Sequence, residues 1–331
     1  MIEPAQLVPE PTPDARWRNQ TVDGTFGRIA APTSSGEALR RAILVTLIYA
    51  DLFDYALTGD EVHRYLIVQA ASAAYVTAML DGDAELRDHI VQTDDRFHLS
   101  GRRHVADIRR ERVAASADLW PVAQRYGARI ARLPFVQLVG VTGALAMNNA
   151  RPDDDIDLFI LTQPGRLWLC RLLVLGVVKL AARGGYVLCP NFLLSTDQLR
   201  LSERNLFTAH EVVQMVPLER NHWYRAFVEA NGWVVNFLPN AFAGQAAETH
   251  PGSMRPMPAR FVAGLLSARV LDPIERWEMR RKVQRLSRRL EREGGSVAFS
   301  EDECRGHFAA HDARILAAYR QRLAEYGDGI Q

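Results

Sequence analysis

The sequence predicts an α+β protein built from several parts. The first third of the chain has apolar residues at helical spacing, followed by two short extended segments. In the last third, arginine and glutamate recur at helical spacing. Between them, two β-branched apolar runs flank a glycine turn and an aspartate cluster. A chain of 331 residues is long enough for two or three domains. The expected parts are a flexible tail over 1–36, a module of helices and a hairpin over 37–102, a basic connecting helix over 103–132, a mixed-sheet domain over 133–240 and a C-terminal helical region over 241–331.

Composition limits the partners and the compartment. Forty Lys and Arg against thirty-nine Asp and Glu give a formal charge of +1, which predicts neither a nucleic-acid nor a membrane partner for the molecule as a whole. Three cysteines, Cys170, Cys189 and Cys304, lack the spacing of a metal knuckle and favour a reducing compartment, so we expect the cytoplasm. The apolar run 167–182 is too short to span a bilayer comfortably and predicts a buried helix.

The first 102 residues begin without periodicity and then become regular. Residues 1–36 mix Pro, Gly, Ser and Thr and lack the pattern of a secretory signal, so we expect little order there. From Glu37 apolar residues recur at helical spacing, and Thr58-Gly59-Asp60-Glu61 predicts a capping box that opens a second helix. A third helix is expected from about Ala71 to Leu80, followed by a hairpin of residues 89–92 and 96–99.

This order of elements resembles the winged helix-turn-helix family over residues 37–102. The resemblance implies that the third helix enters a DNA groove while Arg96, Arg102 and Arg103 contact phosphate. The third helix, however, carries no Arg, Lys, Asn or Gln with which to read bases or bind phosphate. We therefore favour a packing or interaction module, and nucleic acid is a possible but not a favoured partner.

Residues 103–132 predict a long helix interrupted at Pro121. Two interpretations of its arginines stay open, a solvated connecting helix, which we favour, and a basic wall beside a nucleoside triphosphate. The arginines concerned are Arg109, Arg110, Arg112, Arg125, Arg129 and Arg132.

The middle of the chain places carboxylates against a strand. Residues 135–141 and 156–161 predict two strands, joined through a tight turn at Thr142-Gly143-Ala144. Because side chains alternate along a strand, Asp155 and Asp157 are expected on one face. Two carboxylates in one small volume need water or a cation between them, and magnesium, or manganese in its place, is the predicted ion.

The same segment carries a family signature. Gly143-Ala144 is followed by ten residues and then by Asp155-Ile156-Asp157. This spacing resembles the DNA polymerase beta type nucleotidyltransferase superfamily, over about residues 133–240. The resemblance implies that Asp155 and Asp157 bind two magnesium ions, and that the turn at Gly143 and Ala144, with Asn148, binds the phosphates of a nucleoside triphosphate. A nucleoside monophosphate would then pass to an acceptor, with pyrophosphate leaving.

Two positions depart from that family. Ala144 replaces the usual serine, and the later strand 186–195 lacks the third carboxylate, with Asn191 as the polar residue at the expected place. Asp197 or Glu211 could supply the missing acid, and Glu211 is our candidate general base. His210 is predicted to be structural, and the helix 166–182, which is apolar nearly all round, is predicted to pack across the sheet.

The last third predicts a linker over 244–258 and a mostly helical segment over 261–293. Its arginines and glutamates favour a solvated helix with ion pairs over a face that binds a polyanion. A zinc site at Cys304, His307 and His311 is the less favoured interpretation of the following residues, which lack a fourth ligand.

Together these observations predict a central nucleotidyltransferase-like mixed sheet with packed helices, an N-terminal winged helix and a C-terminal helical region. The first functional hypothesis is an enzyme that transfers a nucleoside monophosphate from a nucleoside triphosphate to an unidentified acceptor by two-metal catalysis. The second is a non-catalytic nucleotide-binding or regulatory protein with a winged-helix interaction module, which Asn191 in place of a carboxylate favours.

Overall fold

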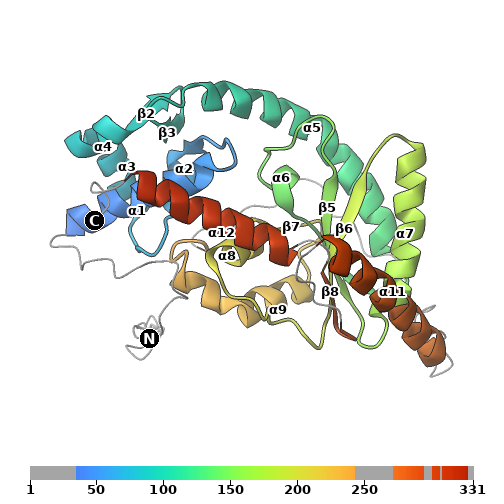
Figure 1. Cartoon of the computed structure of the whole chain (residues 1–331). Helices are drawn as coiled ribbons and strands as arrows, with labels where there is room; N and C mark the ends of the chain where they lie inside the picture. Colours follow the sequence, from blue (N-terminus) through green and yellow to red (C-terminus); the bar gives the residue numbers. More distant parts are fainter. Residues whose placement is uncertain (1–34, 243–270, 294–299, 306–307, 327–331) are drawn as a thin grey trace, which may run out of the picture.

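The structure is a computed structural model that describes residues 35–242, 271–293, 300–305 and 308–326, with the side chains of 285–293 and 308–311 left out (Figure 1). The predictions for the tail before residue 35 and for the linker over 244–258 lie outside these residues. Within the described part, no helix is both long and apolar enough to cross a membrane. The cytoplasm stays a prediction.

The first unit, residues 35–99, contains helices and a small antiparallel sheet in the strand order β1-β3-β2. The predicted capping box at Thr58 and Glu61 is confirmed. The short helix α4 was missed, although Asp83 caps it by accepting a hydrogen bond from the Leu86 N–H. The elements are α1 (Ser35–Asp51), β1 (Leu57–Thr58), α2 (Gly59–Arg64), α3 (Ala73–Gly82), α4 (Ala84–His89), β2 (Ile90–Thr93) and β3 (Arg96–Leu99).

Helix α5 (His104–Ala131) connects the first unit to the central sheet (Figure 1). The predicted interruption at Pro121 is wrong, because the helix continues through it. Burial of its apolar face, including Val122 and Ile130, offsets the hydrogen bond that proline removes.

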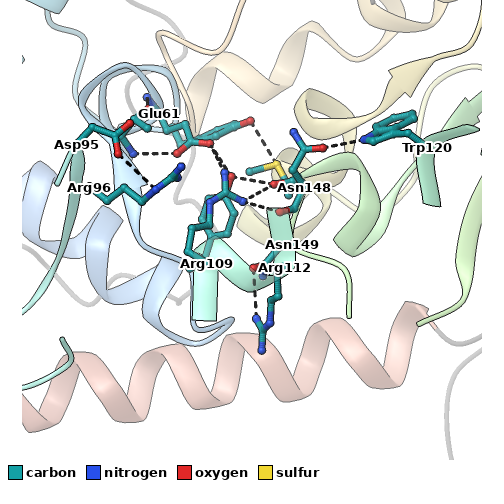
Figure 2. Close-up of polar contacts among 12 residues, drawn as sticks. Glu61, Asp95, Arg96, Arg109, Arg112, Trp120, Asn148 and Asn149 are labelled. Atoms are coloured by element: carbon teal, nitrogen blue, oxygen red, sulfur yellow. Dashed lines mark hydrogen bonds and ion pairs between the residues drawn. The ribbon is translucent and has the colours of Figure 1, made fainter. Parts of the chain in front are cut away.

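Two arginines of α5 are neither solvated nor part of a cavity wall, so both sequence interpretations fail for them. Arg109 is 4% exposed and binds backbone carbonyl groups across the unit boundary (Figure 2). Arg112 donates to the Phe53 carbonyl oxygen at 2.8 Å. These arginines join segments that are distant in the sequence.

The central sheet has the strand order β7-β4-β5-β6-β8. Strands β5 and β6 are parallel, and the other neighbours are antiparallel. β8 comes from the region predicted to be helical, so that prediction is corrected: the C-terminal region also adds an edge strand to the central sheet. The strands are β4 (Val136–Val141), β5 (Ile156–Thr162), β6 (Leu188–Ser195), β7 (Val216–Pro217) and β8 (Glu303–Arg305).

The two faces of this sheet carry different cores. Along β5, Leu158 and Ile160 join the core formed with α5 and α7, while Phe159 and Leu161 join the core formed with α8, α9 and the first unit. Asp157 alternates with Leu158, so it lies on the α8 face, which also faces the first unit. The helices concerned are α7 (Leu167–Arg183), α8 (Leu206–Gln214) and α9 (His222–Ala230), followed by the 3-10 helix η2 (Gly232–Asn236).

Helix α7 packs on the sheet through one face only. Leu172, Leu173 and Leu180 are each about 40% exposed. The prediction that this helix packs across the sheet is confirmed. The prediction of a buried helix is wrong on its outer face.

The C-terminal helices are α11 (Asp272–Glu293), which packs on α7, and α12 (Phe308–Glu325), which packs on α1 and α8 (Figure 1). The expected solvated helix is wrong for Glu275 and Glu278 of α11, which are buried. Glu275 accepts hydrogen bonds from the N–H groups of Trp168 and Leu169 at 2.7 and 2.8 Å and thereby caps the first turn of α7. The Glu275 carboxylate is therefore buried against α7 rather than exposed to solvent.

Candidate active site

A cavity of about 410 Å³ lies between the first unit and the central sheet. This volume is typical of small-molecule sites. The first unit contributes mainly aromatic side chains, and the sheet with the loops around it contributes polar ones. Tyr49, Phe53, Tyr55 and Tyr65 come from the first unit, Gly143, Ala144, Asp155, Asp157, Cys189 and Asn191 from the sheet region, and His210, Glu211 and Gln214 from α8.

Three of these residues form a compact group of potential ligands. Carboxylate oxygens of Asp155 and Asp157 and the Sγ of Cys189 lie within 4.8 Å of one another. Asp155 is exposed at the rim, whereas Asp157 and Cys189 are half-buried. The expectation that the two aspartates share one side of the strand is confirmed.

Cys189, rather than Asn191, is the residue of β6 beside Asp157. In the parallel pair of β5 and β6, Cys189 is the direct partner of Asp157. Its Sγ lies within 4.8 Å of carboxylate oxygens of both aspartates. Asn191, the residue singled out from the sequence, lines the cavity two positions further along the strand. Sequence reasoning missed Cys189 because the register between the strands cannot be read from either strand alone.

Gly143 allows the turn to approach Asp157 closely. Its φ of +65° lies in the left-handed region that favours glycine. A Cβ at this position would overlap Asp157 Oδ2 and lie 3.2 Å from Asp157 Cγ. The glycine turn and the Asp-x-Asp strand therefore meet at one point of the cavity wall.

Burial and mutual repulsion favour the protonated forms of these acids. Burial, and next the Asp155 charge, raises the pKa of Asp157 to about 7. Burial, and next the Asp157 charge, raises the pKa of Glu211 to about 8. Burial and the aspartates also raise the pKa of the Cys189 thiol to about 12. A cation in the cavity would oppose all three effects.

Within the described part of the chain, no basic side chain balances these acids. Among the described residues that line the cavity there is no Lys or Arg. Asp155, Asp157 and Glu211 make no ion pair within the described part of the chain. This absence distinguishes the cavity from a site that binds phosphate directly through basic side chains.

The other candidate residues differ in position. Glu211 and Ala144 line the cavity, whereas Asn148 is not among its lining residues. The Asn148 Oδ1 instead accepts a hydrogen bond from the Trp120 Nε1–H at 2.7 Å, so its side chain is engaged away from the predicted phosphate position (Figure 2). Asp197 is also outside the cavity lining, which leaves Glu211 as the candidate acid.

His210 combines a place in the cavity wall with structural contacts. Its ring stacks on Tyr49 with centroids 4.2 Å apart, and its Nδ1 hydrogen-bonds to the Leu206 carbonyl oxygen at 2.9 Å. Burial lowers the pKa of His210 to about 4. These contacts fit the structural role expected for it.

The DNA-contact residues implied by the winged-helix resemblance are mostly engaged elsewhere. Arg102 pairs with Asp51 and Asp54 at 2.7 Å each, and Arg96 pairs with Asp95 at 3.5 Å (Figure 2 shows the Arg96 pair). Arg103 is exposed. Nucleic-acid binding by this unit stays an unfavoured prediction.

The less favoured zinc prediction is only partly covered by the structure. Cys304 is buried in β8, while His307 and the side chain of His311 lie outside the described residues.

The arrangement can hold a divalent cation between the aspartates and place a bound molecule against aromatic rings. Two carboxylates fit magnesium, which takes oxygen ligands, whereas the thiol beside them does not. Comparisons with family models, curated proteins and solved structures found no match for this chain.

Proposed function

We propose that this chain is a metal-dependent nucleotidyltransferase that moves a nucleoside monophosphate from a nucleoside triphosphate to a small acceptor. The observation that carries the proposal is the contact between Gly143 and Asp157, because it brings the two halves of the signature together. Asp155 lies beside Asp157 at the mouth of the same cavity.

Each residue has a distinct role in this proposal. Asp155 and Asp157 hold the metal, and the turn at Gly143 and Ala144 leaves room for phosphate beside them. A bound divalent ion would neutralise charge that develops on the transferred phosphate. In the balanced reaction, the acceptor oxygen forms a bond to the α-phosphorus, the bond from that phosphorus to the bridging oxygen breaks, and pyrophosphate leaves. Glu211 is proposed to take the acceptor's proton.

The first unit is proposed to be a winged-helix-like module that serves as a wall of the site. Three points support this role: its aromatic side chains line the cavity, Arg96 and Arg102 are paired within the protein, and the exposed positions of α3 carry no basic side chain. An aromatic wall excludes water from the acids and provides faces on which a base or an acceptor can stack.

The test is the substitution Asp155→Asn. Loss of one metal ligand is expected to reduce transfer at least ~1000-fold, equivalent to about 4 kcal/mol of transition-state stabilisation. Asp155 is exposed, so its amide should leave the thermal unfolding midpoint nearly unchanged. The matched control is Asp153→Asn on the exposed turn before β5, which should keep full activity. Full transfer by the Asp155 variant would end the proposal.

One observation favours a second function, a nucleotide sensor without catalysis. The position opposite Asp157 is a thiol rather than a carboxylate, and no basic side chain among the described cavity residues supports a leaving pyrophosphate. Titration with magnesium and each of the four common nucleoside triphosphates, measured for both binding and pyrophosphate release, separates the two functions. Binding without release supports the sensor, and release supports the enzyme.

A further inference from the structure

The potential ligands in the cavity are chemically mixed. Asp155 and Asp157 offer hard carboxylate oxygens, and Cys189 offers a soft sulfur within 4.8 Å of them. Strand pairing fixes this arrangement, because Cys189 is the partner of Asp157 in the parallel ladder of β5 and β6. The sulfur is therefore held at the aspartates by the backbone.

The surroundings of this group independently indicate that a ligand belongs in the cavity. Tyr49 is 4% exposed and lines the same cavity, yet its hydroxyl has no hydrogen-bond partner among the described residues. The hydroxyl of this buried side chain is open to the cavity and available to a bound molecule. The carboxylates of Asp157 and Glu211 likewise have no cation beside them within the described chain, and partly buried carboxylates without a counter-charge cost free energy.

We propose that Asp155, Asp157 and Cys189 together bind a thiophilic divalent ion of the zinc class in preference to magnesium. This inference rests on the metal site of the proposed function and changes the identity of its ion. Magnesium selects oxygen ligands, whereas a thiolate with carboxylates suits zinc or cobalt. Three protein ligands also leave a fourth position open toward the cavity, as in zinc sites that bind a substrate.

Binding requires one proton to leave. The S–H bond of Cys189 breaks, a sulfur–metal bond forms and the proton passes to the solvent, with no change in oxidation state. Cys170 provides a matched control, because it is fully buried on the inner face of α7 and does not line the cavity.

The test uses cobalt(II) as a spectroscopic substitute for zinc with the full chain. The unmodified protein and Cys170→Ala should show the near-ultraviolet charge-transfer band of a thiolate–cobalt bond. Cys189→Ser should lack the band and should bind zinc about 10-fold to 100-fold more weakly than the unmodified protein does. Cys189→Asp, which restores a third carboxylate, should bind magnesium more tightly and zinc more weakly than the unmodified protein does.

Several results would overturn the inference. These are cobalt binding to the unmodified protein without the band, equal dissociation constants for zinc and magnesium, or no binding of any of the three ions. The unmodified protein alone decides these outcomes, so a variant that fails to fold does not block the test.

Pyrophosphate release separates this inference from the proposed function. If the band is present but no pyrophosphate is released with any tested ion, the zinc-class site stands and the transferase fails. If magnesium supports release and the band is absent, the transferase stands and the zinc-class site fails.

Discussion

Charged side chains differ between the two sides of the cavity. On the paired side, around Arg109, they have charged or polar partners; on the unpaired side, around Asp157, the described chain places no cation beside them. Around Arg109, each charge has a partner: the guanidinium donates to Glu61 Oε1 at 3.0 Å and to the carbonyl oxygens of Met147 and Asn148 at 2.6 and 3.0 Å (Figure 2). It also lies over the Tyr55 ring, 3.9 Å from the centroid. Around Asp157, by contrast, the carboxylates have no cation in the described chain.

The difference separates groups that hold the fold from groups kept for a ligand. Arg109 joins the first unit, α5 and the segment after α6 (Gly143–Ala146), so it fixes the aromatic wall against the metal ligands. Asp51 joins α1 to α12 in a similar way. It is 5% exposed and accepts hydrogen bonds from Arg102 and from Arg322 of α12. The unpaired acids near Asp157 make no such connection, and groups of this kind are commonly retained for function at some cost in stability.

The largest effect is expected from breaking the paired side of this comparison. Arg109→Met leaves Glu61 and two backbone carbonyl groups without their donor, and removing one partner of a buried pair costs about 3–5 kcal/mol. Chemical denaturation should measure this loss in the free energy of unfolding.

The matched control is Arg110→Met in the next position of α5. Arg110 pairs with Asp94 and Asp107, but all three side chains are more than 60% exposed. Its loss should leave the free energy of unfolding nearly unchanged, because solvent screens exposed pairs. Equal effects of the two variants would contradict the central role of Arg109.

A smaller effect is expected from disturbing the unpaired side at Gly143. Gly143→Ala places a Cβ on Asp157 Oδ2 in a left-handed backbone conformation. Gly165→Ala shares the conformation, with φ of +64°, but its Cβ would meet nothing within 4 Å. The difference between the two free energies of unfolding therefore isolates the Asp157 contact, and overpacking of this kind costs about 1–3 kcal/mol.

The same pair of variants also reports on the site. Gly143→Ala should weaken metal binding, measured by calorimetry, because Asp157 must move, whereas Gly165→Ala should not. If both variants bind the ion as the unmodified protein does, the close approach of the glycine turn is irrelevant to the site.

Local patterns predicted most of the elements, since they depend on neighbouring residues. The capping box at Thr58, the hairpin of β2 and β3 and the alternation of Asp157 with Leu158 are all encoded within a few residues. β8 was missed because three residues carry too little pattern, and its place at the sheet edge depends on pairing with β6.

The site was predictable in part for the same reason. The aspartates and Gly143 belong to one contiguous motif, so their meeting could be expected. Cys189 and Tyr49 could not be found this way, because strand register and the packing of α1 against α8 bring them in. A solvated Arg109 was the favoured interpretation, because a buried arginine needs partners. These come from residues 61, 147 and 148, which are distant in the sequence.

The smallest expected effect, taken per pH unit, is the pH dependence of the acids around Asp157. In the folded protein the pKa of Glu211 is raised from 4.5 to about 8 and that of Asp157 from 3.8 to about 7. The unfolded chain releases these protons near the lower values, so the folded state holds more protons between about pH 4 and 8. The stabilisation from the protonated acids is therefore complete below about pH 4 and is lost as pH rises through 7 and 8. The slope is at most about 1.4 kcal/mol per pH unit for each group.

Glu211→Gln should make the measured decline in the free energy of unfolding shallower, whereas Glu229→Gln, at an exposed position of α9, should leave it unchanged. A decline that is equally steep in both variants would show that Glu211 is not held protonated by its surroundings, and the contrast with the paired side would then rest on the aspartates alone.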